Sequence, residues 1–183
     1  MIGVLMDCEI YQKEKIKAIV SDFDGVFTDC TGLVDCNGNV SKKINFQDVL
    51  AIAILLHFGI KVAIITGEHS GAVDYLKRKF PKISVFQDIM YKLPVLKDYL
   101  SLQGLTKDEV LYIGDDINDA EVLQYVGFKA TVPNANHMVK DIDGIMITET
   151  SGGQGVLREI TDAVLGDKIK TTFFSGELNE QIS

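Results

Sequence analysis

Three carboxylates follow a short apolar run near the start of the sequence. Asp22, Asp24 and Asp29 come after residues 18–20, whose apolar, β-branched character is typical of a strand buried on both faces of a parallel sheet. Gly25 allows the chain to turn sharply after the first two carboxylates. Carboxylates this close repel each other, and a divalent cation is the usual counter-charge.

An Asp-x-Asp pair alone is equally typical of a solvated acidic turn. Three further apolar runs, however, also lead into polar residues: Thr66 and Gly67 after the second run, Lys92 after the third, and Asp115 and Asp116 after the fourth. The carboxyl ends of parallel strands meet at one edge of a sheet, where ligands bind. The sequence therefore predicts a single site at that edge.

These residue types are suited to phosphoryl transfer, which depends mainly on a positioned nucleophile and on compensation of oxygen charge. Asp22 is the expected nucleophile, forming an aspartyl-phosphate. Asp24, two residues later, is the expected general acid and then general base. Thr66, with the backbone N–H of Gly67, is expected to hold the phosphoryl oxygens, and Lys92 supplies a fixed positive charge.

The remaining acids suggest a Mg²⁺ site. Asp115 is expected to ligate Mg²⁺ together with Asp22, because this ion prefers hard oxygen ligands. Asp116 or Asp119 is expected to orient waters or Lys92 from behind the ligands.

Length and composition indicate one ordinary globular α/β domain. The chain has 183 residues, of which 46% are hydrophobic and 24% are charged, enough for a substantial core. The net charge of −8 argues against nucleic acid and against an anionic membrane surface as partners. No apolar run approaches the roughly 18 residues of a membrane span.

The cysteines and the N-terminus predict a cytoplasmic protein. Cys8, Cys30 and Cys36 are odd in number and have no framework spacing, which indicates free thiols in a reducing compartment. Residues 1–14 lack the positively charged start of a signal peptide.

Strands and helices alternate along the chain, which predicts a Rossmann-like, doubly wound, mainly parallel sheet. The expected strands cover 15–21, 61–65, 84–86, 110–113, 128–132 and 144–148; the expected helices cover 48–58, 70–80, 91–103, a stretch ending near 126, 136–140 and 156–165. We predict one domain over 1–166 and a flexible tail over 167–183. Residues 1–15 show no pattern that assigns them.

A small hairpin is predicted over 31–45, because Asn37-Gly38 between extended residues favours a type I′ turn. No cap domain fits between the expected active-site segments. A phosphoenzyme site needs controlled access of water, so we expect another subunit to supply the lid through this hairpin and the apolar helix 48–58.

The chain resembles the haloacid dehalogenase superfamily of phosphatases. The resemblance covers nearly the whole core and rests on Asp22-Phe-Asp-Gly-Val-Phe-Thr-Asp29, Ile64-Ile-Thr-Gly67, Lys92 and Gly114-Asp-Asp-Ile-Asn-Asp119. It implies the same roles for Asp22, Asp24, Thr66 and Lys92. It also implies a Mg²⁺ ion held by Asp22, the backbone carbonyl of Asp24, and Asp115.

A narrower similarity joins the chain to the 3-deoxy-octulosonate 8-phosphate phosphatases. It rests on the hairpin, on Asn45-Phe-Gln-Asp48 and on Ser151-Gly-Gly-Gln-Gly-Val-Leu-Arg-Glu159. Those enzymes release phosphate from a phosphorylated eight-carbon keto-sugar acid, and they are tetramers in which a neighbouring subunit helps to close the site. The resemblance implies such a substrate and a homotetramer, with Glu68 and Asp48 among the substrate-binding residues.

Two positions depart from that narrower pattern. Glu68 stands where the family usually carries an arginine that can pair with the sugar carboxylate, and an acid there is similar to the nonulosonate 9-phosphate phosphatases. Val49 and Leu50 replace a step that contains glycine. Both the eight-carbon and the nine-carbon sugar acid therefore stay open as substrates.

Three other classes of protein share part of this residue set or of this fold. A signalling receiver domain also uses Asp, Thr, Lys and Mg²⁺, but lacks an acid two residues after its phosphorylated aspartate. A non-catalytic oligomerising or regulatory module would not need the full set of chemical residues. A phosphomutase without a cap would lose its phosphoenzyme to water.

Overall fold

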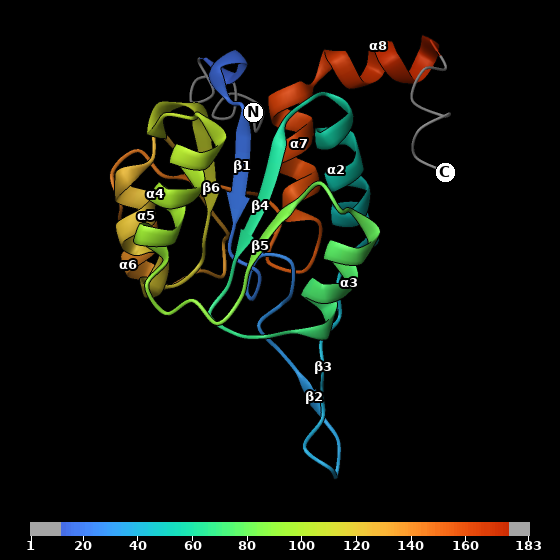
Figure 1. Ribbon diagram of the computed structural model, residues 1–183, viewed down its shortest axis with the longest axis vertical. Coiled ribbons are helices and arrows are strands. Elements are labelled where there is room, and N and C mark those ends of the chain that lie inside the picture. The colour runs from blue at the N-terminus through green and yellow to red at the C-terminus, as the bar shows by residue number, and fades with distance from the viewer. Residues whose placement is uncertain (1–11, 176–183) are drawn as a thin grey trace.

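The computed structural model describes residues 12–175, and Figure 1 shows one parallel sheet between two layers of helices. Most of the expected N-terminal arm and the last residues of the expected tail lie outside this range. Within it, a 3-10 turn at Lys13–Lys15 leads into the first strand.

All six strands of the main sheet are parallel, in the order β5-β4-β1-β6-β7-β8. The strands are β1 Ala18–Ser21, β4 Lys61–Ile65, β5 Ser84–Phe86, β6 Val110–Ile113, β7 Phe128–Thr131 and β8 Met146–Ile147. From β1 the chain builds one half of the sheet through β4 and β5, and then returns to the other side of β1 with β6. The predicted doubly wound fold is confirmed, and its switch point lies between β1 and β6.

Alternate residues of each strand face opposite helix layers, because side chains of a strand alternate in direction. In β4, Val62 and Ile64 join the core beneath one layer, while Ala63 and Ile65 join the core beneath the other. The first layer contains α2 Phe46–His57, α3 Gly71–Lys79 and α7 Val156–Leu165; the second contains α4 Lys92–Gln103, α5 Ala120–Tyr125 and α6 His137–Lys140. Short 3-10 turns at Lys107–Glu109 and Ile117–Asp119 precede β6 and α5.

Helix α2 packs deeply within its own chain. Asn45 caps its start by accepting a hydrogen bond from the backbone N–H of Gln47, and Ile52, Ile54 and Leu55 are buried in the first-layer core. Phe46, at its first turn, stays 69% exposed. Most of the apolar surface of α2, which suggested a contact with another subunit, is therefore buried within its own chain.

The predicted hairpin is present as β2 Leu33–Val34 paired antiparallel with β3 Val40–Ser41, and it projects from the carboxyl edge of the sheet (Figure 1). The expected type I′ turn is wrong. Gly38 has a positive φ of 82°, but Asn37 does not. Instead the Asp35 carboxylate accepts the backbone N–H groups of Asn37 and Asn39 at 2.8 and 2.9 Å, so a side chain shapes the turn.

Beyond Gly166, where the sequence shows no clear period and a flexible tail is predicted over 167–183, the structure contains one more helix. Helix α8 covers Asp167–Ser175 and extends away from the body of the molecule (Figure 1). Ile169 anchors its first turn in the first-layer core. Among residues 12–175 no helix has the length and apolarity needed to cross a membrane. Cys30 and Cys36 are free thiols.

Candidate active site

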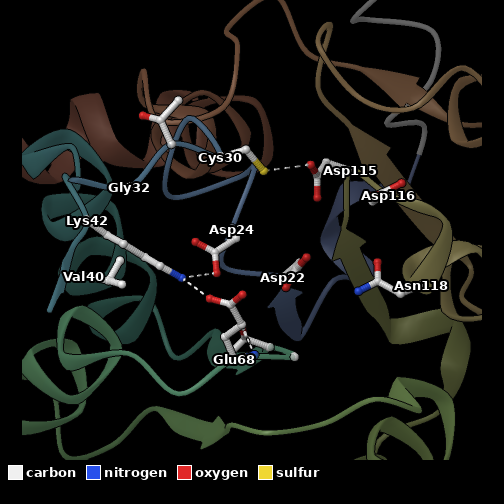
Figure 2. Close-up of a pocket in the computed structure, with 13 residues that line it drawn as sticks. Asp22, Asp24, Cys30, Gly32, Val40, Lys42, Glu68, Asp115, Asp116 and Asn118 are labelled. Carbon is white, nitrogen blue, oxygen red and sulfur yellow. Dashed lines mark hydrogen bonds and ion pairs between the residues drawn. The ribbon is translucent and has the colours of Figure 1, made fainter. Parts of the chain in front are cut away.

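A pocket of about 430 Å³ opens at the carboxyl edge of the sheet, beside the switch point (Figure 2). Loops after β1, β4 and β6 and the hairpin line it. The structure brings together there seven residues expected from the sequence: Asp22, Asp24, Thr66, Gly67, Glu68, Asp115 and Asp116. Lys92 lies directly behind them, in contact with Asp22.

Asp22 continues the line of β1, because its backbone N–H still bonds to the carbonyl of Ile113 on β6, at 2.8 Å. Its side chain is almost fully buried. One carboxylate oxygen, Oδ1, accepts both the Phe23 N–H at 2.7 Å and the Lys92 ammonium at 2.9 Å. The other oxygen, Oδ2, is therefore the one available to a ligand in the pocket.

Asp22, Lys92, Tyr112 and Asp119 form an inner cluster behind the pocket. Lys92, buried at the start of α4, reaches Asp119 at 2.8 Å, and the Tyr112 hydroxyl donates to the same carboxylate oxygen at 2.6 Å. The second Asp119 oxygen accepts the N–H groups of Asp115 and Asp116 at 3.1 and 3.3 Å. Asp119 thus has four donors and orients its neighbours.

The buried acids carry unusual pKa values. Burial, helped by the negative charge of Asp119, raises the pKa of Asp22 to about 8, although Lys92 lowers it in part. Burial and the charges of Asp119 and Asp116 raise the pKa of Asp115 to about 7. Burial lowers the pKa of Lys92, but the carboxylates of Asp119 and Asp22 outweigh it, so the net shift is upward.

The donor set fits a divalent cation. Oxygen atoms of Asp22, Asp115 and Asp119 lie within 4.8 Å of one another. A cation there would offset both the cost of burying these carboxylates and their mutual repulsion. Since Asp119 is already engaged by its four donors, Asp22 and Asp115 are the acids free to ligate. Their hard oxygen atoms suit Mg²⁺.

Gly25 makes room for the Asp115 carboxylate. A Cβ atom at this position would lie 1.8 Å from Asp115 Oδ2, and the φ angle of Gly25 is +86°. The thiol of Cys30 lies 3.7 Å from the same oxygen. Burial, with the negative charge of Asp115, raises the Cys30 pKa to about 12, so this side chain is a protonated donor.

Asp24, Lys42 and Glu68 form a rim cluster at the mouth of the pocket, where the dashed lines in Figure 2 mark their ion pairs. The Lys42 ammonium, from the end of the hairpin, lies 2.6 Å from Asp24 Oδ2 and 2.8 Å from Glu68 Oε2. The Thr28 hydroxyl donates to the other Asp24 oxygen at 3.1 Å. Each oxygen of Asp24 therefore already has one partner.

Thr66 and Gly67 occupy the turn after β4. The Thr66 backbone bonds to Phe86 and Ile89 at 2.9 and 3.0 Å, which holds its buried side chain against the pocket. A hydroxyl and backbone N–H groups at this point suit the oxygens of a phosphoryl group.

Comparisons with known proteins agree with this geometry. Residues 65–160 match the model of the haloacid dehalogenase-like hydrolases, which is more than half of the chain. The chain belongs to this family. It is a phosphatase, as its relatives indicate: the 3-deoxy-D-manno-octulosonate 8-phosphate phosphatase of Haemophilus influenzae is 31% identical over 88% of this chain and 89% of its own. The Escherichia coli K12 enzyme of the same name is also 31% identical, over 85% and 82%.

The chain is also similar to solved structures of phosphatases of the same name. The Moraxella catarrhalis 3-deoxy-D-manno-octulosonate 8-phosphate phosphatase, crystallised with a magnesium ion, a phosphate ion and a KDO molecule, superimposes with a TM-score of 0.84 at 32% identity, over 90% of this chain and 98% of that one. The cobalt-bound Haemophilus influenzae enzyme gives 0.81 at 30%, over 88% and 94%. The receiver domain and the non-catalytic module are thereby excluded.

Two acids of this hydrolase do not reach the pocket. Asp48 was expected to bind substrate, but it is fully buried in the first turn of α2, where Oδ1 accepts the Arg158 N–H at 3.0 Å. It caps the start of α7 instead. Asp29 turns away and accepts hydrogen bonds from Thr31. Asp116, at the pocket edge, caps the 3-10 turn that follows it.

Three contributing residues were missed from the sequence. Lys42 was one of two adjacent lysines that follow the return strand β3, and no motif marked either of them. Thr28 stood inside the first motif without an assigned role. Tyr112 looked like one more apolar residue of β6, because its partner Asp119 comes from a different segment.

Proposed function

We propose that this phosphatase hydrolyses 3-deoxy-D-manno-octulosonate 8-phosphate, with Mg²⁺, through an aspartyl-phosphate. The observation that carries the proposal is the arrangement of Asp22, with one oxygen held by Lys92 and Phe23 and the other available in a pocket shared with Asp115. The curated relatives named for this substrate cover most of the chain.

In the first step, Asp22 Oδ2 attacks phosphorus and the bond to the sugar oxygen breaks. Asp24, two residues later at the pocket rim, gives its proton to the leaving sugar oxygen. Lys92 holds the nucleophile in place, and Thr66 and Gly67 bond to the phosphoryl oxygens.

In the second step, Asp24 accepts a proton from water as that water attacks the phosphorus of the aspartyl-phosphate. The bond to Asp22 breaks, inorganic phosphate leaves and the carboxylate is restored. Mg²⁺ held by Asp22, Asp115 and the Asp24 carbonyl would offset negative charge on the phosphoryl oxygens.

A second candidate substrate is a nonulosonate 9-phosphate. The observation in its favour is Glu68, an acid at the pocket mouth, paired with Lys42. This carboxylate can accept hydrogen bonds from hydroxyl or amide groups of a longer sugar. The chemistry at phosphorus is the same for both substrates.

We also propose a cytoplasmic homotetramer in which the hairpin of one subunit closes the site of another. Leu33, Val34 and Val40 on the hairpin are 78%, 66% and 58% exposed, and apolar residues gathered on a projecting element favour a protein contact. Light scattering at assay concentration tests this. A fully active monomer would contradict it.

The substrate is tested by a phosphate-release screen that compares the eight-carbon and nine-carbon keto-acid phosphates with glucose 6-phosphate. We expect the highest kcat/KM with the eight-carbon compound. A preference for glucose 6-phosphate would overturn the proposal, and a preference for the nine-carbon compound would establish the second candidate.

The nucleophile is tested separately with Asp22→Asn. We expect turnover to fall by at least about 1,000-fold, because an amide cannot form the phosphoenzyme. Circular dichroism serves as the control for folding. Unchanged phosphate release by this variant would remove Asp22 from the mechanism.

A further inference from the structure

Lys42 is the cation in an otherwise acidic pocket. Among the described residues that line the pocket, it alone is positively charged, and five acids line the same pocket: Asp22, Asp24, Glu68, Asp115 and Asp116. Lys92 lies behind the pocket and is committed to Asp22 and Asp119. A substrate with an anionic group away from the phosphate therefore finds one side chain able to recognise it.

The contacts of Lys42 conflict with the task of Asp24. Thr28 occupies one oxygen of Asp24 and Lys42 occupies the other, at 2.6 Å. A leaving oxygen that approaches Asp24 therefore competes with these two partners, and the withdrawal of one of them opens its approach. Lys42 is the one suited to withdraw, because its stem is long and flexible and it has a second partner in Glu68.

Glu68 sets the direction in which Lys42 can withdraw. The side chains of Lys42 and Asp24 are 11% and 26% exposed, whereas that of Glu68 is 71% exposed, so Glu68 is the solvent-facing end of the rim cluster. A Lys42 that leaves Asp24 and stays with Glu68 moves outward, toward the end of the pocket that receives the far end of the sugar. An ammonium has three donors, so it can hold Glu68 and a second anion together.

We propose that Lys42 is a specificity-determining residue that exchanges Asp24 for the carboxylate of the sugar acid. This inference rests on the proposed function and adds to it the residue that binds the carboxylate of the sugar acid. The exchange keeps one cation between two acidic groups before and after binding. It also frees Asp24 to face the leaving oxygen only when an acidic sugar is present.

The test compares substrates with and without a carboxylate in Lys42→Met, which keeps the length of the stem and removes the charge. Octulosonate 8-phosphate and glucose 6-phosphate share a primary-alkyl leaving group, so both need Asp24 equally. We expect kcat/KM to fall by about 30-fold for the sugar acid, because a hydrogen bond to a charged group typically contributes this much to binding. For glucose 6-phosphate we expect kcat/KM to stay the same or to rise, because the variant also releases Asp24 from its ammonium partner. Inhibition by the free sugar acid should weaken by a similar factor.

Lys43→Met is the matched control, because Lys43 is the next residue on the hairpin and is exposed. It should leave both substrates unchanged, and Lys42→Arg should keep most of the preference for the sugar acid. An equal loss for both substrates in Lys42→Met would show that Lys42 only positions Asp24 and would overturn the inference. A wild-type preference that survives Lys42→Met would also overturn it and leave the proposed function standing. A wild-type enzyme without that preference would overturn both.

Discussion

The inner and rim clusters each place a lysine between two carboxylates, but they differ in what holds that lysine. In the inner cluster, Lys92 is fully buried between Asp22 and Asp119, and each of its partners follows a core strand. In the rim cluster, Lys42 also lies between two carboxylates, but it comes from a projecting hairpin and one partner faces solvent. One lysine is held on all sides, whereas the other can exchange partners.

The inner cluster is therefore suited to the reaction itself, and the rim cluster to the choice of substrate. A nucleophile needs a geometry that does not change during turnover, and burial among strand ends provides it. A residue that recognises the substrate must release one partner and accept another, which a position at the pocket rim beside an exposed partner permits. Four substitutions probe this comparison.

Lys92→Met should have the largest effect, because it leaves Asp22 and Asp119 buried without their cation. Removing one partner of a buried ion pair costs about 3–5 kcal/mol of folding stability, and we expect kcat to fall by about 100-fold or more. Chemical denaturation and phosphate release measure the two effects. Adding Asp119→Asn should restore part of the stability but not the activity. A Lys92→Met enzyme as stable as the wild type would contradict the account of the inner cluster.

Gly25→Ala should disturb the loop that joins the two clusters. The added Cβ would meet Asp115 Oδ2 at 1.8 Å, so Asp115 has to move and the Mg²⁺ concentration needed for half-maximal activity should rise by about 10- to 100-fold. Gly38→Ala is the control: its φ is also positive, at +82°, but nothing lies within 4 Å of the new atom. Equal Mg²⁺ requirements in both variants would show that backbone strain alone is responsible.

Asp48 is a buried acid without a lysine, and it should give stability a pH dependence. Burial raises its pKa to about 6 from an ordinary 3.8, so between these values the folded chain binds more protons than the unfolded chain. Folding stability should therefore fall by about 2 kcal/mol as pH rises from 4.5 to 7. The difference between wild type and Asp48→Asn isolates this part, since the other acids titrate in both proteins. Parallel stability curves would contradict the shifted pKa.

Lys42→Met should have the smallest effect on folding. Its ion pairs are partly exposed, and such pairs contribute about 1 kcal/mol or less. Denaturation midpoints of Lys42→Met and Lys92→Met, measured side by side, give the contrast directly. A loss as large as that of Lys92→Met would mean that the rim cluster is structural.

Much of the fold could be predicted because the core strands are short, apolar and clearly bounded. The strands 61–65, 84–86 and 110–113 and the helix 156–165 have the predicted limits. The type I′ turn failed because a side chain, Asp35, competed for the backbone donors. Helix α8 was missed because its contact with the core depends mainly on Ile169, which is too little to produce a period in the sequence.

The sequence alone determined the doubly wound sheet and the gathering of Asp22, Asp24, Thr66 and Asp115 at one edge, because parallel strands must place their carboxyl ends together. It could not assign Asp48 or Lys42 correctly. Asp48 belongs to a motif, yet the folded chain uses it to cap α7, while Lys42 belongs to none and reaches into the pocket. Only tertiary structure decides such cases, because the direction of a side chain at the start of a helix or the end of a hairpin depends on how that element is oriented against the sheet.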